Sequence, residues 1–167
     1  MQSKEEVLKA LKKAMLGEID SISLYQEASS KSQDEQVIKF FCERVEEEKK
    51  HYNFLLKRYK EIDSDKSPVD LTIELTNSHP YSPIISEEFI KRLTENSFIF
   101  SAISTGVLLE KKSFDYYEQQ ANESDNLEVK KLYEVLANWE KTHYDDLIKL
   151  QKETERMFWE INNFEPF

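Results

Sequence analysis

The feature that most constrains this chain is an internal repeat of glutamate and histidine residues. Twice, a glutamate is followed 30 residues later by a second glutamate, with a histidine three residues beyond the second one. The two copies are offset by 92 residues and comprise Glu18, Glu48 and His51, then Glu110, Glu140 and His143. Tyr25 and Tyr117 keep the same offset, each seven residues beyond the first glutamate of its copy. The repeat predicts two similar structural units that place these residues at equivalent positions.

Apolar residues at helical spacing accompany each copy of the repeat. They recur three or four residues apart on both sides of two short polar stretches, 29–34 and 122–125. The chain has only two glycines and four prolines, so long helices meet few interruptions. We therefore expect one all-α domain over residues 1–167, a four-helix bundle built from the helical hairpins 4–62 and 86–157.

The segment between the two hairpins has a different composition. Residues 63–85 lose the helical periodicity and hold three of the four prolines, which predicts a long crossover. Twenty extended residues span about 65 Å, enough to carry the chain along the whole bundle. Residues 86–93 either begin the third long helix or form a short helix before it. The aromatic segment 158–167 is expected to be a tail that docks on the bundle or across a dimer.

Composition and charge argue against several classes of function. A net charge of -10 opposes binding to nucleic acid, whose phosphate backbone attracts cationic proteins. We expect no membrane segment, because no apolar run reaches the ~20 residues that a span needs. With no export signal visible, we expect a cytoplasmic protein. The single cysteine, Cys42, cannot form an intrachain disulfide or a four-cysteine metal site.

The repeated glutamates and histidines fall on the apolar faces of the expected helices. The spacing of Glu48 and His51, and likewise of Glu140 and His143, puts both side chains of each pair on one face. Four carboxylates in an apolar interior would repel one another unless cations neutralised them. We therefore expect two metal ions, rather than six exposed or paired charges. The predicted ligands are Glu18, Glu48, His51, Glu110, Glu140 and His143.

This arrangement resembles the ferritin-like di-iron carboxylate proteins, and rubrerythrins most closely. The resemblance implies a ferritin-like bundle that holds two iron ions per chain. Glu48 and Glu140 would act as bridging or terminal carboxylates, and Tyr25 would lie next to the ligands. Two features differ from the rubrerythrin pattern. Ser113 stands where rubrerythrins carry an additional carboxylate, and one cysteine cannot build their rubredoxin-like module.

The resemblance implies an oxidoreductase that reduces hydrogen peroxide or dioxygen with electrons from a separate donor such as a rubredoxin. An iron-handling ferroxidase is an alternative. Manganese is a further alternative to iron, as in manganese catalases, because oxygen and nitrogen ligands suit both metals. The least specific alternative is a helical interaction module whose glutamates are inert. We expect a homodimer, and we leave His79 out of the site because it has no glutamate partner in the repeat.

Overall fold

The computed structural model describes residues 3–65 and 86–162 of the chain. These residues form five helices and no strand. The helices are α1 (Lys4–Lys31), α2 (Glu35–Asp63), α4 (Glu87–Thr94), α5 (Ser97–Glu123) and α6 (Leu127–Ile161). The all-α prediction and the ferritin-like bundle of two hairpins are confirmed. Most of the predicted crossover lies outside the described residues.

Each described helix begins after a residue whose side chain accepts hydrogen bonds from the first free backbone amides. These N-cap residues are Ser3, Asp34, Ser86, Asn96 and Asn126. At α1 the backbone N of Glu6 donates to Ser3 Oγ at 3.2 Å, and Ser3 N donates to Glu6 Oε2 at 2.7 Å. A cap of this kind stabilises a helix by about 1 kcal/mol. The caps fix where each helix starts, and therefore where the repeated residues lie along the bundle.

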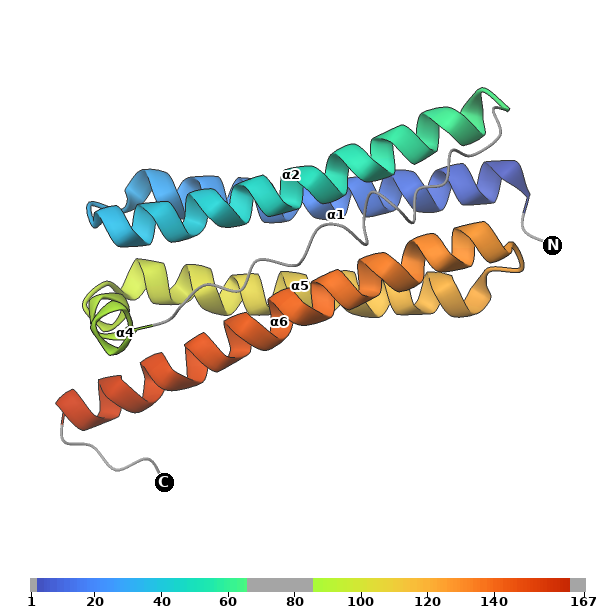
Figure 1. The fold of residues 1–167 in the computed structure, drawn as a ribbon. Coiled ribbons are helices and arrows are strands. Elements are labelled where there is room, and N and C mark those ends of the chain that lie inside the picture. Colours follow the sequence, from blue (N-terminus) through green and yellow to red (C-terminus); the bar gives the residue numbers. More distant parts are fainter. Residues whose placement is uncertain (1–2, 66–85, 163–167) are drawn as a thin grey trace.

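The four long helices form two antiparallel hairpins that lie side by side (Figure 1). Helix α1 packs against α2 and α5, and α5 packs against α6. The short helix α4 crosses the end of the bundle that also holds the turn between α1 and α2 (Figure 1). An ion pair of 2.6 Å between Arg92 Nη1 and Asp34 Oδ2 ties α4 to the start of α2. None of the described helices has the length and apolar character that spanning a membrane requires.

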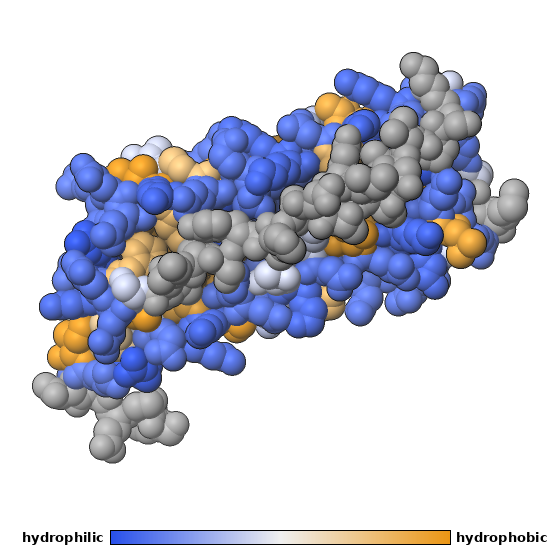
Figure 2. Space-filling view, viewed as in Figure 1, coloured by the Kyte–Doolittle hydropathy of each residue, from blue (hydrophilic) through white to orange (hydrophobic). Residues whose placement is uncertain are grey.

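The bundle core consists of two apolar clusters, separated by the repeated glutamates and histidines. The first cluster lies at the α4 end and includes Tyr25, Phe41 and Leu147. The second lies at the other end and includes Leu11 and Leu136. On each long helix one or two repeated residues stand between members of the two clusters. Hydrophilic side chains are the most common among the described residues on the face shown in Figure 2, as expected for a chain with 34% charged residues.

The structure decides one helix boundary that the sequence leaves open and changes another. Helix α4 ends at Thr94 and α5 begins at Ser97, so of the two alternatives for residues 86–93 the structure has the separate short helix, capped by Ser86. Helix α6 continues to Ile161, so the second hairpin extends beyond the end at residue 157 that the sequence predicts. An ion pair of 2.5 Å between Arg156 and Glu160 supports this last turn, because residues four apart face each other on a helix. Residues 163–167 lie outside the described part of the chain.

The two glycines give a matched test of packing inside the bundle. A Cβ added at Gly106 would lie 3.0 Å from Tyr25 Oη and 3.3 Å from Leu147 Cδ1, whereas one added at Gly17 would meet only Ser113 Oγ, at 3.8 Å. Replacing glycine by alanine within a helix gains about 0.5–1 kcal/mol, and crowding a packed core costs about 1–3 kcal/mol. We therefore expect Gly106→Ala to lower the free energy of unfolding by about 1 kcal/mol, and Gly17→Ala to raise it by up to about 1 kcal/mol. Urea denaturation of both variants measures the difference, and equal shifts would contradict the close packing of Gly106 on Tyr25.

Candidate metal centre

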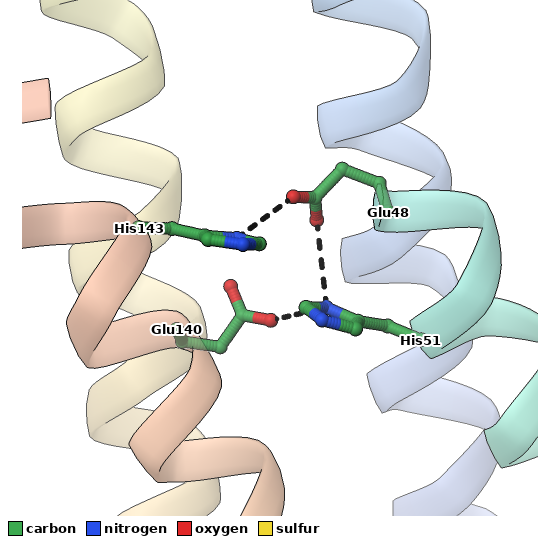
Figure 3. Close-up of side chains that lie close together, drawn as sticks. All are labelled: Glu48, His51, Glu140 and His143. Atoms are coloured by element: carbon green, nitrogen blue, oxygen red, sulfur yellow. Dashed lines mark ion pairs between the residues drawn. The ribbon is translucent and has the colours of Figure 1, made fainter. Parts of the chain in front are cut away.

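The six predicted ligands come from all four long helices and meet in the interior. Helix α1 carries Glu18, α5 carries Glu110, α2 carries one glutamate and one histidine, and α6 carries the equivalent pair. The side chains of Glu48, His51, Glu140 and His143 converge between α2 and α6 (Figure 3). Each of these four offers one ligand atom, and these atoms lie within 4.8 Å of one another. All six residues are at most 1% exposed to solvent.

His51 is surrounded by carboxylates from three helices. Its Nδ1 lies 2.7 Å from Glu140 Oε1, 3.4 Å from Glu18 Oε2 and 3.8 Å from Glu48 Oε2. The indole of Trp139 lies against the imidazole, with 4.6 Å between the ring centroids. His51 therefore lies between Glu18 and the two glutamates Glu48 and Glu140.

His143 has the corresponding position in the second copy of the repeat. Its Nδ1 lies 3.1 Å from Glu48 Oε1 and 3.8 Å from Glu110 Oε2. The imidazoles of His51 and His143 are nearly parallel, with an angle of 14° and 5.2 Å between their centroids. The pseudo-symmetry that the sequence repeat predicts is thus present in the arrangement of the side chains.

Glu110 and Glu18 each accept a hydrogen bond from a buried tyrosine. Tyr25 Oη donates a hydrogen bond of 2.5 Å to Glu110 Oε1, and Tyr117 Oη donates one to Glu18 Oε1. Both bonds connect α1 with α5. The expected proximity of Tyr25 to the ligands is present in the structure. Tyr117, which is not part of the predicted site, makes the equivalent contact in the other half, and its place in the 92-residue repeat was the available signal.

The centre therefore divides into two halves that share Glu48 and Glu140. We call the first the Glu18 half, which contains Glu18, His51 and Tyr117, and the second the Glu110 half, which contains Glu110, His143 and Tyr25. Tyr117 belongs to the apolar cluster that includes Leu11, and Tyr25 belongs to the one at the α4 end. The two halves follow one another along the bundle axis.

The carboxylates raise the pKa of both histidines. Burial alone would lower the pKa of His51, but its contact with Glu18 and the charges of the neighbouring glutamates outweigh this effect and raise it to about 9. Contacts with Glu110 and Glu48 likewise outweigh burial and raise the pKa of His143 to about 9. Both imidazoles are therefore protonated at neutral pH in the metal-free protein.

Burial and the neighbouring charges also shift the pKa values of the carboxyl groups. Burial, followed by the charge of Glu110, raises the pKa of Glu48 to about 7. Burial, together with the charges of Glu18 and Glu48, raises the pKa of Glu140 well above its usual value. Burial opposes ionisation of Glu110 too, but its contacts with His143 outweigh burial and hold its pKa low. In the metal-free cluster, protons compensate the negative charge of the carboxylates. Bound metal cations would compensate the same charge in place of the protons.

The buried donor atoms fit two metal ions. Both oxygens of Glu48, both ring nitrogens of each histidine, and one oxygen each of Glu110 and Glu140 have no hydrogen bond of acceptable geometry within the described structure. Buried polar atoms left in this state are costly unless a ligand satisfies them. Imidazole nitrogens and carboxylate oxygens are ligands that iron, manganese and zinc all accept. The arrangement fits a dinuclear metal site, and the assignment of the six side chains as its ligands is a proposal.

Reasoning from the sequence alone missed one charged residue near the centre. Arg44 is completely buried in α2, one helical turn before Glu48. It lies on the same helical stripe as Phe41, Glu48 and His51, so its position in the sequence pattern was the available signal. Arginine is seldom fully buried without a partner. An arginine in a sequence is therefore normally expected to be exposed, and the burial of Arg44 was not predicted.

Protonation of the two histidines predicts a pH dependence of metal binding. A metal ion needs neutral imidazoles, so it must displace protons wherever the pH lies below the histidine pKa of about 9. We expect the affinity for Zn²⁺ to rise from about pH 6 to about pH 9, with release of at least one proton per ion near neutral pH. Isothermal titration calorimetry in buffers of different ionisation enthalpy measures both quantities.

The control for this measurement is Glu46→Gln, which changes an exposed glutamate on α2 and should leave the proton release unaltered. His51→Gln should reduce both the affinity and the number of protons released. A Zn²⁺ affinity that stays constant over this pH range would contradict the protonated state of the metal-free site.

Comparison with known families agrees with the geometry of the centre. A model of the family described as Rubrerythrin matches residues 9–151, a segment that holds all six predicted ligands and both tyrosines. A search of curated proteins found no match. The family match covers most of the chain and includes the ligand-bearing parts of all four long helices. The chain therefore belongs to the rubrerythrin family.

Proposed function

We propose that the protein is a di-iron oxidoreductase that reduces hydrogen peroxide or dioxygen with electrons from a separate donor. The observation that carries the proposal is the buried group of Glu48, His51, Glu140 and His143, whose ligand atoms lie within 4.8 Å of one another. Membership of the rubrerythrin family supports an oxidoreductase. Iron is proposed as the metal on the basis of the family match, because the nitrogen and oxygen donors would suit iron and manganese alike.

Each half of the centre would hold one ion. Glu18 and His51 would bind the first, Glu110 and His143 the second, and the shared Glu48 and Glu140 would contact both. Two bound ferrous ions would together supply the two electrons that reduction of an O–O bond requires. The donors come from four helices with capped ends, so little reorganisation of the backbone is needed to keep them in place.

The surrounding residues would exclude water and hold protons. Apolar clusters above and below the ligands close the interior to bulk solvent. Reduction of hydrogen peroxide to two waters consumes two protons as well as two electrons. Burial, followed by the charges of neighbouring glutamates, raises the pKa of Tyr25 and Tyr117, so both hydroxyls keep their protons in their bonds to Glu110 and Glu18.

The electron donor would be a separate protein such as a rubredoxin. The single cysteine of the chain cannot build the four-cysteine iron site of a rubredoxin-like module. We also propose that the protein acts as a homodimer in the cytoplasm. A donor that carries its own iron site would have to approach the surface of the bundle, because all six proposed ligands are buried.

A ferroxidase that handles iron is the second candidate function. Ser113 stands where the rubrerythrin pattern has an additional carboxylate, which leaves a symmetric set of six ligands closer to that of bacterioferritins. The net charge of -10 would attract iron cations to the protein. Under this alternative, dioxygen is the oxidant and the bound iron leaves the site after oxidation.

Stopped-flow mixing distinguishes the two functions. Protein loaded anaerobically with ferrous iron is mixed with hydrogen peroxide or with dioxygen, and oxidation is followed by absorbance. We expect oxidation by peroxide to be at least about tenfold faster than for free ferrous iron at equal concentration, because the ligands hold two ions together. Faster reaction with dioxygen, followed by release of iron, would favour the ferroxidase.

Two variants test whether the proposed ligands carry this reaction. His143→Gln removes one nitrogen ligand and should abolish the fast phase, whereas Glu46→Gln alters an exposed residue of α2 and should retain it. Circular dichroism shows whether each variant is folded. Wild-type protein that reacts with peroxide no faster than free iron would contradict the proposed peroxide reduction.

A further inference from the structure

Arg44 is a buried cation that has no hydrogen-bonding partner among the described residues. Its side chain is 0% exposed, and none of its nitrogens Nε, Nη1 and Nη2 makes a hydrogen bond within the described structure. The ring of Phe40 lies 5.6 Å from the guanidinium carbon. An isolated buried charge is strongly unfavourable unless nearby opposite charges compensate it. The carboxylates of the metal centre can provide that compensation through space.

The position of Arg44 along α2 assigns it to one half of the centre. The order on this helix is Arg44, Glu48 and His51, with about one helical turn between successive residues. His51 belongs to the Glu18 half, so Arg44 lies on the opposite side of Glu48. Its neighbours Phe40 and Phe41 are in the apolar cluster at the α4 end, which also holds Tyr25.

The electrostatic effects of Arg44 point to the same half. Its positive charge acts to lower the pKa of Tyr25 and of Glu110, the hydrogen-bonded pair of the Glu110 half. Both effects agree with the place of Arg44 on α2, one helical turn before Glu48.

Within the described residues, the Glu18 half has no cation at the equivalent position. The 92-residue offset that superposes Glu48 on Glu140 also superposes Arg44 on Leu136. Leu136 is 0% exposed and belongs to the apolar cluster next to the Glu18 half. The two copies of the repeat therefore differ in charge at this position, although the backbone and the proposed ligands are pseudo-symmetric.

We infer that Arg44 makes the two metal positions unequal, so that a divalent cation binds first in the Glu18 half and more weakly in the Glu110 half. The inference rests on the proposed metal binding and adds an order of loading to it. A cation placed between Glu110 and His143 is repelled by the nearby guanidinium and must compete with it for the charge of Glu110. A cation beside Glu18 and His51 has an uncharged leucine at the corresponding position. Arg44 thus acts through its positive charge, which weakens cation binding in the Glu110 half, and it does not itself bind the metal.

Titration with redox-inert ions tests this order. Metal-free protein is titrated with Zn²⁺ by calorimetry and with Co²⁺ by visible absorbance. We expect two binding steps in the wild type, with dissociation constants that differ by about tenfold or more. Arg44→Leu installs the residue found at the equivalent position, and it should tighten the second step about tenfold while changing the first much less. Arg44→Lys keeps the charge and should keep the two steps apart.

Arg58→Leu is the matched control. Arg58 is another buried arginine on α2 and corresponds to Leu150 in the repeat, but it pairs with Glu61 and Glu128, away from the centre. This variant makes the same chemical change and should leave the separation of the two steps unaltered. An equal change in both leucine variants would assign the effect to general loss of a buried arginine and overturn the inference.

A second measurement needs no variant and stands even if Arg44→Leu fails to fold. A crystal of the wild type with one equivalent of Zn²⁺ should show anomalous scattering beside Glu18 and His51. Preferential occupancy beside Glu110 and His143, or equal occupancy of both, would overturn the inference. Failure of the wild type to bind any stoichiometric metal would instead refute the proposed function.

Discussion

The rest of the structure depends on the cost of burying four carboxyl groups and two imidazoles between apolar clusters. Protons compensate part of the negative charge, as the raised pKa values of Glu48, Glu140 and both histidines indicate. Two cations would remove the repulsion among the carboxylates and satisfy the unpaired donor atoms together. The long capped helices and the buried tyrosines hold these groups in one polar layer. A shift of one helix by a single turn would separate its ligands from the others, so the fold and the centre specify each other.

Much of this arrangement could be predicted from the sequence, because the helical period and the repeat are both visible in the order of the residues. The spacing of Glu48 and His51 put both on one face, and the 92-residue offset predicted that Glu140 and His143 would meet them. The separate helix α4 and the end of α6 at Ile161 could not be fixed in advance. Both depend on tertiary packing or on side-chain pairs in the last turn, which the period of apolar residues does not record.

The roles of single residues were harder to predict than the ligand set. Tyr117 could have served only as a core residue, and its bond to Glu18 became evident once α1 and α5 were placed side by side. Arg44 occupies a core position that is filled by Leu136 in the other repeat, and only burial in three dimensions shows that its charge is not solvated. The duplicated scaffold thus supplies symmetry in the ligands, while a single substitution in the repeat makes the electrostatic field of the two halves different.

An anaerobic titration of the metal-free protein with ferrous iron tests the central claim most directly. Binding is measured to saturation, and the iron retained after desalting is determined by elemental analysis. The proposed ligand set predicts two irons per chain in the wild type and a clear loss of bound iron in Glu48→Gln, which removes a shared ligand. A folded wild-type protein that retains no stoichiometric iron, and binds no manganese or zinc in its place, would contradict the claim that this buried cluster is a dinuclear metal site.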